Sequence, residues 1–328
     1  MSSQTCLCKA WSGPAIREIL GRRIHINSES KAIKLYRYFV ANPSQSKYIK
    51  HVHFTLNNAA LPLVITELLP VLINPNIRKL TGTVKSDMFF NTLFAIVDNA
   101  QLTNLQTLPV YSGRNSGVCY ERILRLKSTT ISLKVPLINF TAGSLWNFVR
   151  QFHQFPKLTK LEINGYVRNL LELETVLKGC AHLVKLTIHD FEFKELPANG
   201  MQIRDLNRWL YGNSITKVTS LKTLKVQSTC RPEFVEYLLY KYPNIGLFTF
   251  EGNLWHPNGS IAICNGNLDR ILNATARVPC KKDMTLILPS QTRMRDALHF
   301  SIGRLENITY DLKENQGKDQ LVMKIQDN

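Results

Sequence analysis

Pairs of cysteines and histidines are the residues of this chain whose types and spacing could bind a metal ion. Cys6 and Cys8 are separated by one residue, and His51 and His53 alternate along a segment with the pattern of a strand. A zinc site needs further ligands. Cys6 and Cys8 have no second Cys or His pair at a ligand spacing, and no third ligand is evident for His51 and His53. We therefore predict no metal site and no cofactor, and we expect the two histidines to be exposed residues of a strand.

Sequence motifs of catalysis are also absent. The chain contains no GxSxG, HExxH, phosphate-loop or GxGxxG motif. Segment 252–267 is rich in Gly and Asn, but it lacks the adjacent Lys and Ser or Thr of a phosphate-binding loop. A long loop between structural repeats explains this segment better. We predict no catalytic residues and expect that the chain is not an enzyme.

A short apolar phrase recurs along the chain and indicates the elements that would position binding residues. It consists of an apolar residue, two variable residues, a second apolar residue, one variable residue and a third apolar residue. The clearest copies are Leu158, Leu161 and Ile163; Leu183, Leu186 and Ile188; and Leu221, Leu224 and Val226. Because one such strand cannot bury its own apolar edge, the copies must stack on one another.

Further copies of the phrase extend this pattern toward both ends of the chain. They begin at residues 49, 77, 105, 245 and 305, and decayed copies are expected near Leu133 and Met284. Several spacings fall in the range of roughly 20 to 29 residues that is typical of leucine-rich repeats. Apolar residues three and four apart predict helices between the phrases, at 28–43, 59–73, 86–100, 144–153, 167–179, 203–212, 232–242 and 267–276.

This alternation of strands and helices predicts an α/β fold. We expect a leucine-rich-repeat solenoid, with a curved parallel sheet on the concave face and helices on the convex face. No linker rich in Gly, Ser or Pro divides residues 27–328, which would form one array of about ten irregular repeats.

Strand geometry predicts which residues of the array face outward. If positions one, four and six of the phrase fill the core, positions three, five and seven lie on the concave face. The predicted target-binding residues on this face are His51, His53, Tyr111, Lys160, Glu162, Lys185, His189, Lys225 and Gln227. The lysines on consecutive repeats would form a basic stripe, unless they are ordinary solvated lysines.

The charge of the chain constrains its partners. It has 41 Lys and Arg against 24 Asp and Glu, which gives a formal net charge of +17. This balance favours an acidic or phosphorylated target protein, or nucleic acid. The seven cysteines are scattered, and the sequence shows neither a signal peptide nor an apolar run that could span a bilayer. We therefore expect no membrane partner and a location in the cytoplasm, the nucleus or both.

The N-terminal segment resembles the last helix of an F-box. The matching phrase is Leu7, Cys8, Lys9, Ala10 and Trp11, and a short basic run follows it before the first repeat. The resemblance identifies residues 1–26 as the C-terminal remnant of a truncated F-box. It implies that Leu7, Cys8 and Trp11 contact a Skp-type adaptor, although Trp11 could instead be a core anchor that seals the first repeat.

A second segment is similar to the cysteine-containing repeat of F-box/leucine-rich-repeat proteins. This segment is 178–188, in which Cys180 would be a small buried residue that packs a turn. The opening leucine-proline segment and the first two helices of an F-box have no counterpart in the sequence. Either the start belongs to a truncated gene model or splice form, or the protein no longer docks into a cullin ligase through the usual surface.

Three functions are compatible with these observations. The resemblance implies a substrate-recognition subunit of an SCF-type ubiquitin ligase, which binds a target through its repeats and leaves the chemistry to other subunits. The second is a repeat scaffold without a ligase link. The third is a basic nucleic-acid-binding repeat protein, although clustered Arg with interleaved exposed aromatic residues is lacking.

Overall fold

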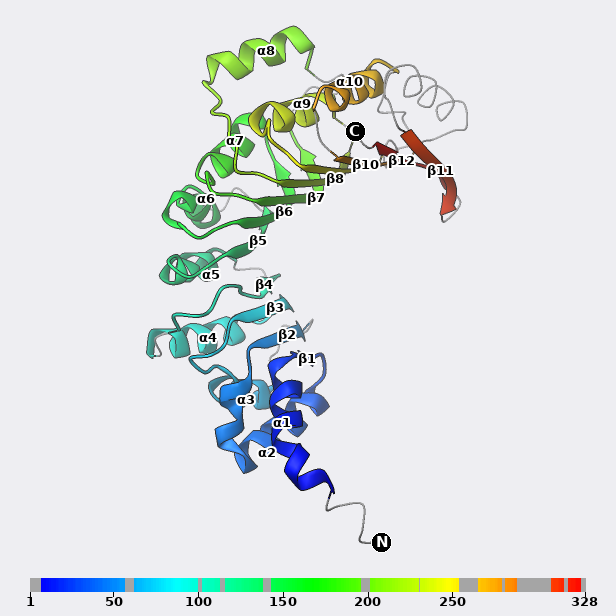
Figure 1. Cartoon of the computed structure of the whole chain (residues 1–328). Coiled ribbons are helices and arrows are strands. Elements are labelled where there is room, and N and C mark those ends of the chain that lie inside the picture. Colours follow the sequence, from blue (N-terminus) through cyan, green and yellow to red (C-terminus); the bar gives the residue numbers. More distant parts are fainter. Residues whose placement is uncertain are drawn as a thin grey trace. The chain divides into compact units, whose positions relative to one another are not determined.

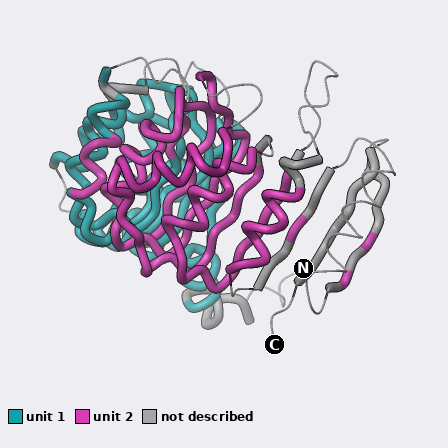
Figure 2. Tube along the Cα trace, turned by 90° about the horizontal axis from the view of Figure 1, so that it is seen from above, with its two compact units in different colours: residues 1–134, 142–148, 154–157 teal, residues 135–141, 149–153, 158–328 magenta. Residues whose placement is uncertain are grey.

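The structure is a computed structural model in which the chain forms two compact units (Figure 2). Residues 1–134, 142–148 and 154–157 form the N-terminal unit, and residues 135–141, 149–153 and 158–328 form the C-terminal unit. The described residues are 7–56, 62–99, 102–112, 116–137, 143–195, 201–229, 231–253, 265–278, 281–287, 308–315 and 318–325.

The N-terminal unit contains a parallel sheet of four strands, in the order β1-β2-β3-β4. These strands are β1 (Arg23–Ile26), β2 (His51–Leu56), β3 (Lys79–Val84) and β4 (Val110–Tyr111). Its first helices are α1 (Leu7–Gly21), α2 (Glu29–Ala41), η1 (Pro43–Tyr48), α3 (Leu63–Leu72) and α4 (Asp87–Asn99). They are followed by α5 (Ser116–Ile123), η2 (Leu124–Leu126) and α6 (Gly143–Val149).

The second sheet has eight strands in the order β11-β12-β10-β9-β8-β7-β6-β5. Its parallel part includes β6 (Lys160–Val167), β7 (Lys185–Phe193), β8 (Thr223–Thr229), β9 (Leu247–Asn253) and β10 (Lys281–Ile287), and the division into units falls within β5 (Ser132–Leu137). The associated helices are η3 (Phe152–Gln154), α7 (Leu170–Lys178), α8 (Ile203–Gly212), α9 (Pro232–Lys241) and α10 (Asn265–Ala276). In Figure 1, helices α7, α9 and α10 lie on one side of this sheet.

The predicted core positions of the repeated phrase are buried. All nine apolar residues of the three clearest copies are at most 2 % exposed, and the polar residues between them are exposed or partly exposed. Alternation of this kind is what a strand produces when helices cover one of its faces. The sequence prediction of a mixed α/β fold with parallel strands is therefore confirmed.

Two backbone features shape the strands. Gly82 in β3 has φ of +100°, and a Cβ placed there would lie 1.8 Å from the carbonyl oxygen of Phe54. Only glycine fits such a close approach of two neighbouring strands. In β7, the register shifts between His189 and Phe191, and Asp190 adopts φ of +48°. This geometry marks a bulge at a residue type that tolerates the left-handed region.

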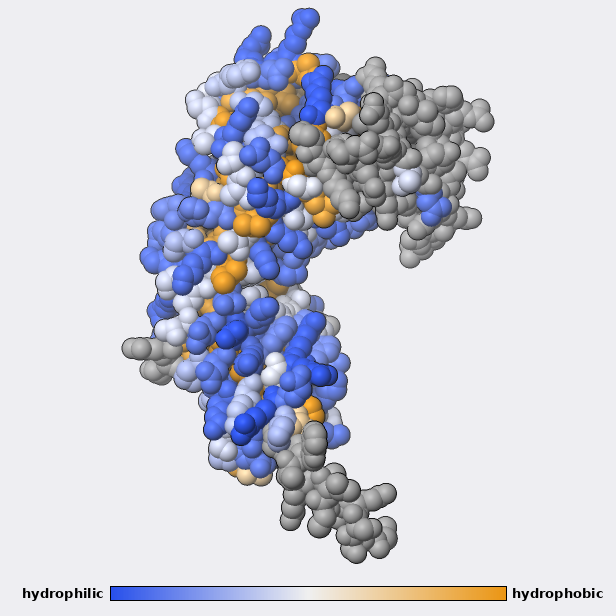
Figure 3. Space-filling view, in the orientation of Figure 1, coloured by the Kyte–Doolittle hydropathy of each residue, from blue (hydrophilic) through white to orange (hydrophobic). Residues whose placement is uncertain are grey.

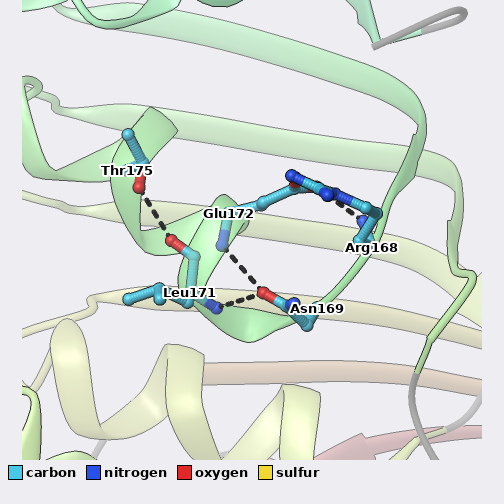
Figure 4. A network of polar contacts seen from close by, with 5 residues as sticks. All are labelled: Arg168, Asn169, Leu171, Glu172 and Thr175. Carbon is cyan, nitrogen blue, oxygen red and sulfur yellow. Dashed lines mark hydrogen bonds and ion pairs between the residues drawn. The ribbon is translucent and has the colours of Figure 1, made fainter. Parts of the chain in front are cut away.

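Side-chain caps and a buried ion pair hold the helices of the C-terminal unit. Asn169 accepts hydrogen bonds from the backbone N–H groups of Leu171 and Glu172 at the start of α7 (Figure 4). This satisfies donors that a helix start otherwise leaves free. Within the helix layer, Lys241 of α9 donates to the carboxylate of Glu174 in α7 at 2.8 Å, and both residues are buried.

Three sequence predictions differ from the structure. Tyr111 is only 2 % exposed, so it does not lie on the exposed face. Pro109 and Tyr111 are buried while Val110 is partly exposed, because the alternation slips by one residue at a proline that cannot donate a strand hydrogen bond. Tyr111 instead donates its hydroxyl hydrogen to Asp87 and packs edge-on against Phe90.

The second difference concerns the copy that begins at residue 305. It was expected to add another parallel strand, but β11 (Ile308–Asn315) pairs antiparallel with β12 (Lys318–Ile325). Strand β12 also lies antiparallel to β10. The third difference is that the strands form two sheets instead of one continuous parallel sheet.

Candidate functional site

The outward face of strands β1 to β3 gathers basic and hydroxyl side chains, and we call it the histidine face, together with Lys134 of β5, whose charge acts on His53. It is defined by Arg23, His25, His51, His53, Thr55, Lys79, Thr81 and Lys134. Parallel register places Arg23, His51 and Lys79 side by side on β1, β2 and β3. His25, His53 and Thr81 form the next row.

Threonine hydroxyls tie the three imidazoles to the sheet. The Thr81 hydroxyl lies 2.8 Å from His51 Nε2 and 3.0 Å from His53 Nδ1. His25 Nε2 lies 3.1 Å from the Thr55 hydroxyl, and the rings of His25 and His53 meet edge to face with centroids 4.7 Å apart. These contacts fix ring orientation, so the imidazoles are held in place before any ligand arrives.

Burial and neighbouring charges lower the pKa of two of these rings. Partial burial lowers the pKa of His51 below its ordinary 6.5, and the positive charges of Arg23 and Lys79 lower it further. Partial burial also lowers the pKa of His53, with further contributions from Arg23, His25 and Lys134. Strands β1 to β5 contain no Asp or Glu. The face therefore has a surplus of positive charge that no acidic residue of these strands offsets.

This surplus is solvent-accessible. Arg23, His25, Lys79 and Lys134 are exposed, while His51 and His53 are partly exposed. In the space-filling view, the surface of the N-terminal unit is predominantly hydrophilic (Figure 3). A polar, cationic face of this kind can attract anions and donate hydrogen bonds to them.

The outward face of β6 to β9 in the C-terminal unit has a different composition, and we call it the mixed face. Its residues are Lys160, Glu162, Asn164, Lys185, Thr187, His189, Thr223, Lys225, Gln227, Leu247, Thr249 and Glu251. His189 Nε2 lies 3.0 Å from the Glu162 carboxylate, and Gln227 donates to Glu251 at 3.0 Å. Acidic groups here are already engaged with neighbouring strands.

The predicted lysine stripe is not continuous on this face. Lys160 and Lys185 lie directly opposite each other, but the partner of Lys185 on β8 is Thr223. Lys225 lies two residues further along its strand, opposite Thr187. The reason is that Lys225 occupies position five of its phrase, whereas the other two lysines occupy position three.

The remaining predicted site residues fall into two groups. His51, His53, Lys160, Glu162, Lys185, His189, Lys225 and Gln227 all have exposed or partly exposed side chains on the strand faces, as the phrase predicts. Residues Leu7, Cys8 and Trp11 belong to helix α1, but their side chains lie outside the described part of the chain, as does Cys6. Their adaptor contacts stay a prediction.

The structure also locates a buried thiol that the sequence singled out. Cys180 is buried, as predicted, and its thiol donates to the carbonyl oxygen of Val176 at 3.7 Å. Burial raises its pKa to about 12 and also raises the pKa of the Cys119 thiol. Neither thiol is a nucleophile in this state, because the thiolate is the reactive form.

Within the described ranges, no group of three or more His, Cys, Asp and Glu residues could hold a metal ion. Among the same residues, no helix has both the length and the apolar character needed to cross a membrane.

Sequence reasoning missed five members of the histidine face: Arg23, His25, Lys79, Thr81 and Lys134. Strand β1 lacks the first apolar residue of the phrase, since Gly21 occupies that position. One signal was present: residues 23, 51, 79 and 107 recur at a constant spacing, and the structure connects them as neighbours across successive strands.

Comparison with known proteins does not identify the chain: no protein-family model matches it, and no curated protein matches it. Its function therefore has to be inferred from its own residues and their arrangement.

Proposed function

We propose that this chain is a non-catalytic leucine-rich-repeat protein that binds a target protein through the outward faces of its strands. The observation that carries the proposal is the register of these strands. On β6, β7 and β8, the buried residues of the phrase align with one another, and so do the polar residues between them. Repetition of one strand unit in register produces a broad polar surface, which suits recognition of a macromolecule.

We propose further that the chain is the substrate-recognition subunit of an SCF-type ubiquitin ligase. The support for this link is the resemblance of Leu7, Cys8 and Trp11 to the last helix of an F-box, and these residues lie in helix α1. In such an assembly, the chain contributes proximity between a target and separate catalytic subunits.

Pull-down with a purified Skp-type adaptor tests the ligase link. We expect the chain, or the chain fused to a complete F-box, to retain the adaptor, and the Trp11→Ala variant to retain at least about tenfold less if Trp11 is an interface anchor. Tyr211→Ala is the matched control, because Tyr211 is an exposed aromatic residue of α8, far from α1 in the sequence. If neither the chain nor its fusion to a complete F-box retains the adaptor, the ligase function is excluded.

Target capture tests the repeat-protein function separately. Proximity labelling in cells should recover one set of proteins with the unaltered chain and lose it when polar residues of the strand faces are replaced. Lys185→Ser with Lys225→Ser alters the mixed face without touching the core, since neither side chain is buried. Unchanged capture by this variant and by a histidine-face variant would contradict binding through the strand faces.

A further inference from the structure

We propose that the histidine face binds a phosphorylated segment of a partner protein. This inference rests on the proposed function as a target-binding repeat protein and names the chemical class of the target. It also assigns the contact to the N-terminal unit, on Arg23, His51 and Lys79 and the row of His25, His53 and Thr81 beside them.

Charge complementarity is the first argument. Three permanently charged side chains, those of Arg23, Lys79 and Lys134, act on His51 or His53. The strands that carry them contribute no carboxylate. Clustered like charges repel one another, and an anion placed among them removes that repulsion. Binding of a negatively charged group to this face is therefore electrostatically favourable.

The arrangement of donors is the second argument. Neighbouring strands are about 4.8 Å apart, so Arg23, His51 and Lys79 present a guanidinium, an imidazole and an ammonium group at closely spaced points. Arg donates through a planar fork that suits phosphate oxygens, and Lys adds a compact charge. The hydroxyl groups of Thr55 and Thr81 lie among these donors.

The number of donors favours phosphate over a carboxylate. A phosphoserine or phosphothreonine carries a charge of about −1.5 to −2 at neutral pH and three acceptor oxygens. A carboxylate carries one charge and two oxygens, which leaves part of this donor set without a partner. A protein segment, in contrast to a nucleic acid, also needs only one such group and no row of aromatic residues for stacking bases.

Protonation of the histidines would then be coupled to binding. Besides burial, charge interactions with Arg23, Lys79 and His53 lower the pKa of His51, and those with Arg23, His25 and Lys134 lower the pKa of His53. A bound phosphate offsets these charges and raises the pKa of both rings, so binding takes up protons. By linkage, affinity increases as the pH falls from 7.5 to 6.5, where the phosphate keeps most of its second charge.

Fluorescence polarisation with the full chain provides the test. The probe is a peptide pool with a fixed central phosphoserine and degenerate flanks, compared with pools that carry serine or glutamate at that position. We expect the phosphoserine pool to bind at least about tenfold more tightly than either. We also expect its affinity to rise about two- to threefold between pH 7.5 and 6.5.

Matched charge-removing variants locate the site. Arg23→Ser with Lys79→Ser should weaken binding of the phosphoserine pool at least about tenfold. Lys178→Ser with Arg204→Ser removes the same charge from exposed helix positions of the C-terminal unit, and it should leave binding within about twofold. If the first variant does not fold, histidine NMR signals of the unaltered chain replace it: those of His51 and His53 should shift with the peptide, and that of His189 should not.

Three outcomes would overturn the inference: equal affinity for the phosphoserine and serine pools, equal affinity for the glutamate pool, or equal weakening by the two variants. Tighter binding of single-stranded RNA, with a steep salt dependence, would also overturn it in favour of nucleic acid. Failure here leaves adaptor binding and target capture by the mixed face intact. Loss of adaptor binding, conversely, leaves the peptide measurement unaffected, so the two proposals can fail independently.

Discussion

The histidine face and the mixed face arise from the same repeated strand unit but manage charge in opposite ways. On the histidine face, basic side chains stand beside one another and beside threonines. On the mixed face, Glu162 and Glu251 meet a histidine and a glutamine of the adjacent strand. The fold thus dictates where polar side chains lie. The residue types at positions three, five and seven decide whether these side chains are available to a ligand or are hydrogen-bonded to side chains of the adjacent strand.

The two units also differ beneath their surfaces. The buried polar residues described in the N-terminal unit are Ser86 and Thr130, both uncharged. Those in the C-terminal unit include Glu172, Glu174, Glu233 and Lys241. Buried charged side chains are thus described in the C-terminal unit, whereas strands β1 to β5 carry basic side chains and no acidic ones.

Removal of one partner from the buried ion pair should destabilise the C-terminal unit most. Lys241→Met leaves the buried Glu174 carboxylate with the Tyr237 hydroxyl, 2.5 Å away, but without its cation. We expect a loss of about 3–5 kcal/mol in the free energy of unfolding, measured by urea denaturation. Adding Glu174→Met to this variant should restore most of the lost free energy of unfolding. The control Lys178→Met, at an exposed position, should change the free energy of unfolding little. A loss below about 1 kcal/mol would contradict a pairing role.

Substitution of Gly82 should have the next largest effect, in the N-terminal unit. In Gly82→Ala, the new methyl group collides with the Phe54 carbonyl oxygen, and the positive φ adds strain. The two strands that carry most of the histidine face must separate, and we expect a cost of about 2–4 kcal/mol in urea denaturation. Gly246→Ala is the control, since its new methyl group would come no closer than 3.4 Å to a neighbouring atom, the Lys222 carbonyl oxygen. Equal effects would show that the close approach at Gly82 is not needed.

The pH dependence of stability should distinguish the two faces by a smaller amount. The pKa values of His51 and His53 are lowered in the folded state, so the unfolded chain binds protons first as the pH falls through 6.5. Stability is therefore fully present above pH 6.5 and decreases below it, until the folded histidines also titrate. We expect less than about 1 kcal/mol, because both rings are partly exposed to solvent. Thermal unfolding of His51→Gln/His53→Gln should show a flatter pH profile than the unaltered chain, and identical profiles would refute the coupling.

The smallest predicted effect concerns two like charges on the mixed face. Lys160 and Lys185 are direct strand neighbours, and Lys185→Glu converts this repulsion into attraction. We expect a gain of about 0.2–1 kcal/mol in the free energy of unfolding at low salt, decreasing as salt is added. Lys185→Gln, which only removes the repulsion, should give about half of this gain in the free energy of unfolding. A destabilised Lys185→Glu variant would indicate that neighbouring groups such as Glu162 dominate the local field.

The repeated phrase was sufficient to predict most of the strands. It succeeds where three apolar residues fill the inner positions, as in β6 to β9, because burial against helices imposes that spacing. It fails at β1, where Gly21 replaces the first apolar residue, and at β12, whose antiparallel pairing with β10 is a tertiary contact that no local pattern specifies.

The candidate sites were predictable only in part, for similar reasons. Outward positions follow from strand alternation, so His51 and His189 were found. Tyr111 was misplaced because Pro109 slips the alternation by one residue. Which side chains are neighbours across two strands depends on the register of the strands. Lys225 and Lys185 occupy different positions of their phrases, so they are not direct neighbours.

The Thr81 hydroxyl between two imidazoles has a consequence for the order of events on its face. A hydroxyl owns one hydrogen, so it can donate to His51 or to His53 but not to both, and the other ring must donate to Thr81. The two rings are therefore unequal partners whose tautomers change together. The ring that donates can take the first proton at its other nitrogen and keep both hydrogen bonds, whereas the accepting ring must first lose the bond from the hydroxyl. The two rings therefore take up protons one after the other, and the first protonation affects the second.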